Sequence, residues 1–193
     1  MSVHAFYVSN EETNHLKINK MNSKITLALV LLFTVFGTVQ LKAQEDKSQR
    51  KSPPAVVEGE INGVNVTVDY SQPSLNDRTV WGDLVKYDKV WRTGANEATK
   101  ITFDKDVLIE GKDLSAGTYG LFTIPTEGKW TVIFNTEADQ WGSYGYKAKF
   151  DALRVQVEPK ANDKTEVLTF DISDSAVELM WDEIAVGFEV EAK

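Results

Sequence analysis

The chain has 193 residues, no cysteine, two histidines and a formal net charge of −8. Both histidines, His4 and His15, lie near the amino end, so the rest of the chain lacks the thiols and imidazoles used for Ser-His-Asp or Cys-His catalysis, for haem ligation and for the usual zinc sites. We therefore predict no metal, no cofactor and, from the acidic charge, no nucleic-acid partner.

The start of the chain is typical of a leader for export. A short basic stretch at 21–24 is followed by an apolar run at 25–39 and by Ala43, a small residue at a plausible cleavage point. This is the layout of a secretory signal peptide, and the run is shorter than the ~20 apolar residues of a membrane-spanning helix. We expect residues 1–20 to be an extension from a mis-assigned start codon and residues 21–43 to be the signal peptide. The mature protein is then expected to be periplasmic or secreted, with no stable membrane insertion and, for lack of cysteine, no lipoprotein anchor.

The remaining residues divide into a linker and one domain. Residues 44–54 are mostly charged or polar and end in Ser52-Pro53-Pro54, which predicts a flexible linker. Residues 55–193 have the length of a single domain, which is enough to bury a hydrophobic core without disulfides.

Short stretches of alternating apolar and polar residues run through this domain. The first two, 56–61 and 64–70, flank Asn62-Gly63, a dipeptide that favours a hairpin because both central residues of a type I′ turn need positive φ. A short helical turn is expected at 81–85. Further strands are expected at 101–103, 107–110, 114–124, 130–135 and 153–157.

Three more strands, at 168–172, 177–181 and 184–190, are predicted to form a meander. Their apolar residues alternate with acidic ones, and a period of two with one polar face is typical of antiparallel sheets solvated on one side. About ten short strands, with turn residues every eight to twelve positions, predict an all-β fold: an antiparallel β-sandwich or jelly-roll-like single domain.

The segment 90–99 interrupts the alternation with an aromatic, an arginine, an amide and a carboxylate. We interpret Arg92, Asn96 and Glu97 as candidate ligand-binding residues, because Arg offers a planar fork of donors and the other two add an amide and an acceptor. Gly94 would let the backbone turn and approach a ligand closely. The alternative is a structural network in which a buried Arg92 pairs with Glu97 or another acid, and we expect Arg92 to be largely structural.

A second candidate element is the loop 136–150, which carries Trp141, Tyr144 and Tyr146 among small residues. These rings could form a stacking platform for a sugar or a peptide. The alternative is a lid of aromatic side chains that closes one end of the sandwich. We include Trp141 and Tyr144 among the candidate ligand-binding residues and expect Trp141 to be available to a ligand.

Several motifs occur in an order that resembles one bacterial family. They lie at residues 70–74, 78–82, 91–99, 116–119, 122–125, 130–133, 140–142 and 151–155. Over nearly the whole mature chain, the sequence is similar to the family called domain of unknown function 2911, and the run at 91–99 is specific to that family. The resemblance implies an exported, single-domain, mainly β protein and supplies no function. This chain departs from the pattern at Gln72, where an arginine is frequent, and at Asp77, where a glycine is frequent.

Three functions agree with these observations. The favoured one is an exported, non-catalytic β-sandwich module that binds an unidentified small ligand, glycan or protein partner through the segment 90–99 and the loop 136–150. The second is a cofactor-free hydrolase or isomerase acting on carbohydrate with carboxylates and Tyr119, which would need two acids roughly 5–10 Å apart across a cleft. The third is a structural module of an envelope assembly, which would need an exposed sheet edge or apolar patch.

Overall fold

The computed structural model describes residues 46–193. The predicted extension, the signal peptide and the first two residues of the predicted linker lie outside the described residues. Within residues 46–193 we find no helix with the length and apolar character that a membrane span requires.

The first two strands form the predicted hairpin. β1 (Pro54–Ile61) pairs antiparallel with β2 (Val64–Ser71). The two residues between the strands have positive φ, 51° at Asn62 and 81° at Gly63, as a type I′ turn requires. Alternate residues of β2 are buried, so this strand turns one face toward the core.

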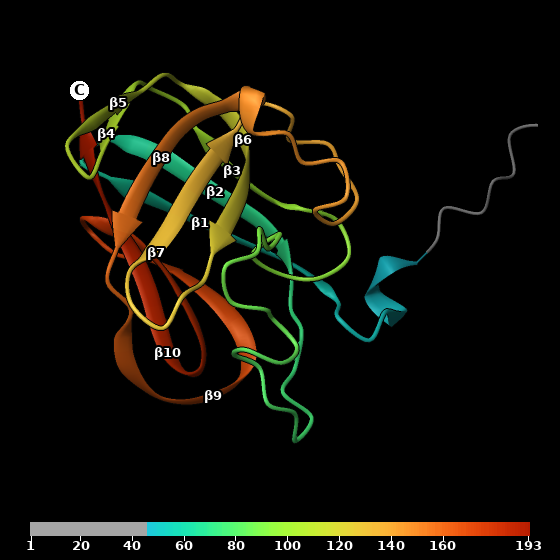
Figure 1. Ribbon diagram of the computed structural model, residues 1–193. Coiled ribbons are helices and arrows are strands. Elements are labelled where there is room, and N and C mark those ends of the chain that lie inside the picture. Colours follow the sequence, from blue (N-terminus) through green and yellow to red (C-terminus); the bar gives the residue numbers. More distant parts are fainter. Residues whose placement is uncertain (1–45) are drawn as a thin grey trace, which may run out of the picture. The chain divides into compact units, whose positions relative to one another are not determined.

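Two antiparallel sheets form a sandwich, which confirms the predicted fold class (Figure 1). The larger sheet has the order β1-β2-β3-β6-β7-β8, and the smaller sheet has the order β5-β4-β10-β9. The other strands are β3 (Thr99–Phe103), β4 (Val107–Ile109), β5 (Lys112–Leu114), β6 (Gly117–Ile124), β7 (Trp130–Asn135), β8 (Asp151–Val157), β9 (Lys160–Ile172) and β10 (Ala176–Ala192). Two short 3-10 helices, η1 (Lys47–Gln49) and η2 (Ala148–Phe150), complete the described part of the chain.

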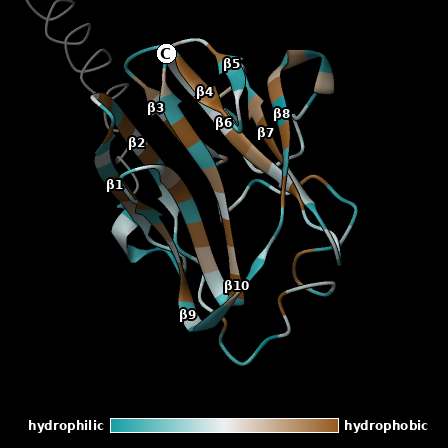
Figure 2. Ribbon diagram, turned by 90° about the vertical axis from the view of Figure 1, so that its left-hand side faces the viewer, coloured by the Kyte–Doolittle hydropathy of each residue, from teal (hydrophilic) through white to brown (hydrophobic). Residues whose placement is uncertain are grey.

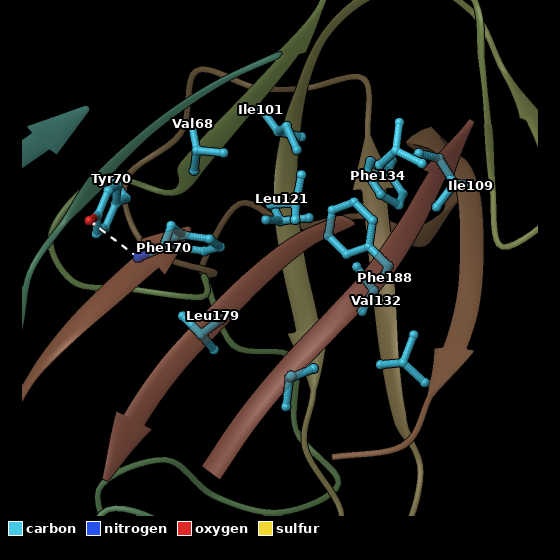
Figure 3. Close-up of a cluster of buried hydrophobic side chains, with 14 of the residues drawn as sticks. Val68, Tyr70, Ile101, Ile109, Leu121, Val132, Phe134, Phe170, Leu179 and Phe188 are labelled. Atoms are coloured by element: carbon cyan, nitrogen blue, oxygen red, sulfur yellow. Dashed lines mark hydrogen bonds between the residues drawn. The ribbon is translucent and has the colours of Figure 1, made fainter. Parts of the chain in front are cut away.

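The core lies between the inner faces of the two sheets. Hydrophilic and hydrophobic residues alternate along several strands, as Figure 2 shows, and β3 buries every second side chain. The central strand β6 instead buries five consecutive residues. Figure 3 shows core side chains of both sheets meeting: Val68, Ile101, Leu121, Val132 and Phe134 from the larger, and Ile109, Leu179 and Phe188 from the smaller. Each such side chain contributes about 1.5–3 kcal/mol by leaving water. The Tyr70 hydroxyl accepts a hydrogen bond of 3.3 Å from the backbone N–H of Phe170, which joins β2 to β9 across the sandwich (Figure 3).

The end of the chain differs from the predicted meander. Residues 177–181 and 184–190 belong to one strand, β10, which forms a long hairpin with β9. Asp182 has a φ of 55°, and the register with β9 shifts on both sides of it, so this position is a β-bulge rather than a turn. The extra residues lie on β9, which advances from Thr169 to Thr165 while β10 advances only from Met180 to Asp182. The inward-facing positions of β10 step by three across this irregularity, from Trp181 to Ile184. The same break in the alternation is also typical of a loop between two strands, which is why the sequence predicts two strands here.

A long irregular segment, residues 72–98, connects β2 to β3. It is hydrogen-bonded to β9, where the Leu168 N–H donates to the Pro73 carbonyl at 2.9 Å. It is also bonded to β6, where Trp91 and Thr123 exchange two backbone hydrogen bonds of 2.8 and 2.9 Å. An irregular connection of this length inside a compact domain is commonly functional.

Candidate functional site

Segment 90–99 is held in an irregular conformation by buried hydrogen bonds. The Trp91 indole N–H donates to the Gly94 carbonyl at 3.1 Å, and the Thr99 hydroxyl donates to the Thr93 carbonyl at 2.8 Å. A Cβ on Gly94 would lie 2.9 Å from the Thr99 Oγ1. Close packing against Thr99 and the Ser71 carbonyl is therefore sufficient to explain a glycine at this position.

The two candidate elements lie together. The backbone of residues 96–98 pairs with that of residues 140–142 through two hydrogen bonds of 3.0 Å, and Glu97 and Trp141 stand opposite each other in an isolated antiparallel bridge. Residues that are far apart in the sequence thus become neighbours, and the loop 136–150 is fixed at its middle against segment 90–99.

The base of the same loop is fixed by a polar network. Asp151 accepts hydrogen bonds of 2.7 Å from the side chains of Asn135, Tyr146 and Arg154. Asn135 is fully buried, and its side-chain oxygen accepts a hydrogen bond from the backbone of the loop. Burial, and then the hydrogen bond to Asp151, raise the pKa of Tyr146 to about 12, so its hydroxyl remains a donor at neutral pH. These side chains close the loop at its base, and the sequence did not predict that they form a network.

Glu97 is an ion-pair centre. The Nη1 of Arg50 lies 3.1 and 2.8 Å from its two carboxylate oxygens, and the Nζ of Lys47 lies 2.9 Å from one of them. Partial burial opposes ionisation of Glu97, but the hydrogen bonds from Lys47, its own backbone and Arg50 outweigh burial and lower its pKa to about 2. Glu97 is thus a carboxylate at neutral pH, with cations already bound.

Trp141 faces the same arginine. The Cζ of Arg50 lies 5.6 Å from the Trp141 ring centre, within the range of a cation–π contact. The Trp141 side chain nevertheless stays 56 % exposed. Asn96, a third predicted site residue, has a φ of 57° and donates from Nδ2 to the Ser52 carbonyl at 2.9 Å. Arg50 and its neighbours were not among the predicted site residues, because they lie in the predicted linker. The only signal there was three basic residues, Lys47, Arg50 and Lys51, next to an acidic domain.

Arg92 is not part of the predicted network. Among residues 46–193 it forms no ion pair, its buried Nε has no hydrogen-bond partner, and Glu97 is bound by Arg50 and Lys47 instead. Burial lowers the pKa of Arg92, and Tyr144 acts in the opposite direction. Tyr144 is 92 % exposed. The predicted pairing of Arg92 with an acid is therefore wrong for the described residues.

A small polar cavity lies beside Glu97. Its volume is about 70 Å³, and its lining includes Asp69 and Glu97 together with Lys47 and Lys100. Pockets that enclose small-molecule ligands are larger, roughly 300–1,000 Å³. The cavity thus has room for water molecules but not for a sugar ring.

A larger acidic hollow lies elsewhere, at the edge of the sandwich. Its volume is about 430 Å³, and four glutamates are among its lining residues, namely Glu110, Glu158, Glu178 and Glu189. None of the predicted site residues lines it. In the part of the chain that the structure describes, no group of three or more acidic side chains is arranged to hold a metal ion.

Four of the five tryptophans form a cluster that sequence analysis missed. Trp81 is at its centre, with ring centres 4.9 Å from Trp130, 5.9 Å from Trp91 and 5.8 Å from Trp181. The residues around Trp81 form a turn with a parallel bridge to Val85, rather than the predicted helical turn. Through Trp91 the cluster anchors segment 90–99 to the core. Positions 81, 91, 130 and 181 have no common spacing, so no sequence signal could have grouped them.

The fold and the site together define an all-β sandwich protein with an aromatic surface loop fixed on an irregular segment. The chain belongs to the family described as "Protein of unknown function (DUF2911)", which matches residues 52–190. This match confirms the resemblance of the motifs. It includes the predicted site residues and begins after Lys47 and Arg50. No curated protein and no solved structure matches the chain.

Proposed function

We propose that the protein is an exported, non-catalytic module that binds a protein partner through Arg92, Trp141 and Tyr144, which we call the aromatic surface. The observation that carries this proposal is that Trp141 and Tyr144 are 56 % and 92 % exposed on a loop held at its middle and at its base. Trp, Tyr and Arg are the residue types enriched at the energetic centres of protein interfaces. Rings on a fixed loop lose little conformational entropy on binding. Export rests on the signal-peptide pattern at 21–43.

Carbohydrate hydrolysis is less well supported by the same residues. An acid catalyst needs a pKa near the working pH, and the pKa of Glu97, about 2, is far below it. Glu97 and Asp69 share a cavity of about 70 Å³, too small for a sugar. Tyr119, which the hydrolase hypothesis pairs with the carboxylates, donates its hydroxyl to the Ser115 carbonyl at 2.8 Å. Burial, and then the charge of Asp106, raise the pKa of Tyr119.

A purely structural role also has weaker support. Outside the aromatic surface, the exposed large apolar side chains of the described residues are Val56, Leu84 and Val167, each from a different element. Single exposed apolar residues are normal on a soluble domain and do not define an interface.

Site-specific photocrosslinking in the native host tests the proposal. A benzophenone amino acid replaces Tyr144, and a matched control replaces Asp171, which is exposed on β9 of the smaller sheet. We expect a protein adduct at position 144 that is absent at 171 and is weakened at least tenfold by Trp141→Ala. Mass spectrometry of the adduct decides its class. An adduct with a sugar would mean that the partner is a glycan and not a protein. The absence of any adduct specific to position 144 would overturn the proposal.

A further inference from the structure

The cation over Trp141 comes from a segment outside both sheets. Residues 47–53 precede β1 and contain η1, none of whose residues is buried. The segment is held against the protein by the side chains of Lys47 and Arg50, which both bind Glu97. Two of its carbonyls also accept hydrogen bonds of 2.9 Å, that of Ser52 from Asn96 and that of Pro53 from the Gln72 N–H. A segment with so little buried surface opens locally at low free-energy cost.

The groups that receive Arg50 have complementary chemistry. Glu97 provides a charged acceptor at 2.8 and 3.1 Å from a single guanidinium nitrogen, and Trp141 provides a ring whose centre lies 5.6 Å from the guanidinium carbon. A carboxylate and an aromatic face recognise a planar guanidinium better than a compact ammonium, because guanidinium is more weakly hydrated and stacks on rings. Only 15 % of the Arg50 side chain remains exposed.

We infer that Glu97 and Trp141 form an arginine-binding site, which Arg50 of the same chain occupies and which an arginine of the partner polypeptide occupies when residues 47–53 are displaced. This inference rests on the proposed function and names the chemistry of the partner. A polypeptide source is favoured because Asn96 binds a main-chain carbonyl two residues after Arg50. The same amide can bind the corresponding carbonyl of an incoming segment. The net charge of −8 favours encounter with a basic segment.

The site can be tested with a small probe. In protein carrying Arg50→Ala, ethylguanidinium is titrated and the indole N–H signal of Trp141, assigned with Trp141→Phe, is followed by proton–nitrogen correlation NMR. We expect saturable binding with a Kd on the order of 1 mM. Binding should be at least tenfold weaker for ethylammonium at equal ionic strength, for the unsubstituted protein, and for the Arg50→Ala/Glu97→Gln double variant. Equal responses to the two cations, or a response that persists in the double variant, would overturn the inference.

A second measurement keeps the inference falsifiable if Arg50→Ala fails to fold. It uses the photocrosslinker at position 144, in the native host, with Glu97→Gln as the only other change. We expect the yield of protein adduct to fall at least fivefold, because the arginine of the partner loses its carboxylate. Where Arg50→Ala folds, the yield should rise instead. An adduct whose yield does not change in Glu97→Gln would leave the protein-binding proposal standing and refute the arginine site. The absence of any protein adduct at position 144 would refute the proposed function and the existence of a protein partner. The titration with ethylguanidinium would still test whether Glu97 and Trp141 bind a guanidinium group.

Discussion

Asn135 donates a hydrogen bond of 2.7 Å from its side-chain amide to the Oδ1 of Asp151, and this bond closes the base of the loop 136–150 from the end of β7 to the start of β8. The Asn135 amide is fully buried and also donates to the Lys147 carbonyl at 3.2 Å. The stability of the aromatic surface therefore depends on a group of polar side chains behind it.

Asp151→Ala should destabilise the protein by about 1–3 kcal/mol, because the buried Asn135 amide loses one of its two acceptors and keeps only the Lys147 carbonyl at 3.2 Å. Tyr146→Phe removes one of the hydrogen bonds to Asp151 and should cost less, about 0.5–1.5 kcal/mol. Chemical denaturation measures both. A larger loss for Tyr146→Phe than for Asp151→Ala would contradict this view of the network.

Glu97 should make stability depend on pH in the acid range. Its folded-state pKa of about 2 lies below the ordinary value near 4.5, so the unfolded chain takes up the proton first as pH falls. The contribution of Glu97 to stability is therefore complete above pH 4.5 and is lost as pH falls from 4.5 to 2. Glu97→Gln should flatten the curve of unfolding free energy in this window, and added salt should reduce the difference because the pair is partly exposed. Glu127→Gln, in the exposed turn between β6 and β7, is the control and should leave the curve unchanged.

Arg92→Met should change the free energy of unfolding by less than about 1 kcal/mol. This expectation replaces the one drawn from the sequence, because the structure shows no carboxylate among the described residues that the substitution would strand. Methionine keeps the apolar stem of the side chain and removes the unpaired Nε. Denaturation of the two proteins measures the difference, and a loss of 3–5 kcal/mol would mean that Arg92 has a buried anionic partner.

Trp81→Ala should cost about 3–5 kcal/mol and reduce the near-ultraviolet circular dichroism, because three other tryptophan rings pack around it. Trp81→Phe should cost clearly less, since the buried indole N–H of Trp81 has no acceptor to lose. Trp141→Ala is the matched control on the surface and should cost under about 1 kcal/mol. If Trp141→Ala costs as much as Trp81→Ala, Trp141 closes the fold and is not available to a partner.

The fold class could be predicted because strand patterns and turns are local. Alternation along β2 and the Asn62-Gly63 turn need no knowledge of distant residues, and the structure confirms both. The prediction of two strands in place of β10 was wrong for an equally local reason. A bulge and a short loop both break the alternation, and only the pairing partner distinguishes them.

The candidate site could be predicted only in part. The exposure of Trp141 and Tyr144 could be predicted, because aromatic residues in a polar loop lie at the surface. The ion-pair partners of charged residues could not be predicted, because they depend on the tertiary fold. Glu97 takes Arg50, which lies 47 positions earlier, rather than the nearby Arg92. Positive φ at Thr93 and Asn96, 54° and 57°, turns the chain between these neighbours, so closeness in sequence does not give contact.

The two attachments of the loop 136–150 leave residues 143–145 as a short tip. Residues 140–142 are bonded to segment 90–99, and the Tyr146 hydroxyl is bonded to Asp151. The tip itself contributes a local hydrogen bond of 3.2 Å, from the Tyr146 N–H to the Ser143 carbonyl. Replacing or lengthening residues 143–145 would alter the outermost contact surface without disturbing a strand, a core residue or an anchoring bond. The protein thus presents a ready position for grafted recognition peptides, and a position at which related chains can diverge in specificity while keeping one scaffold.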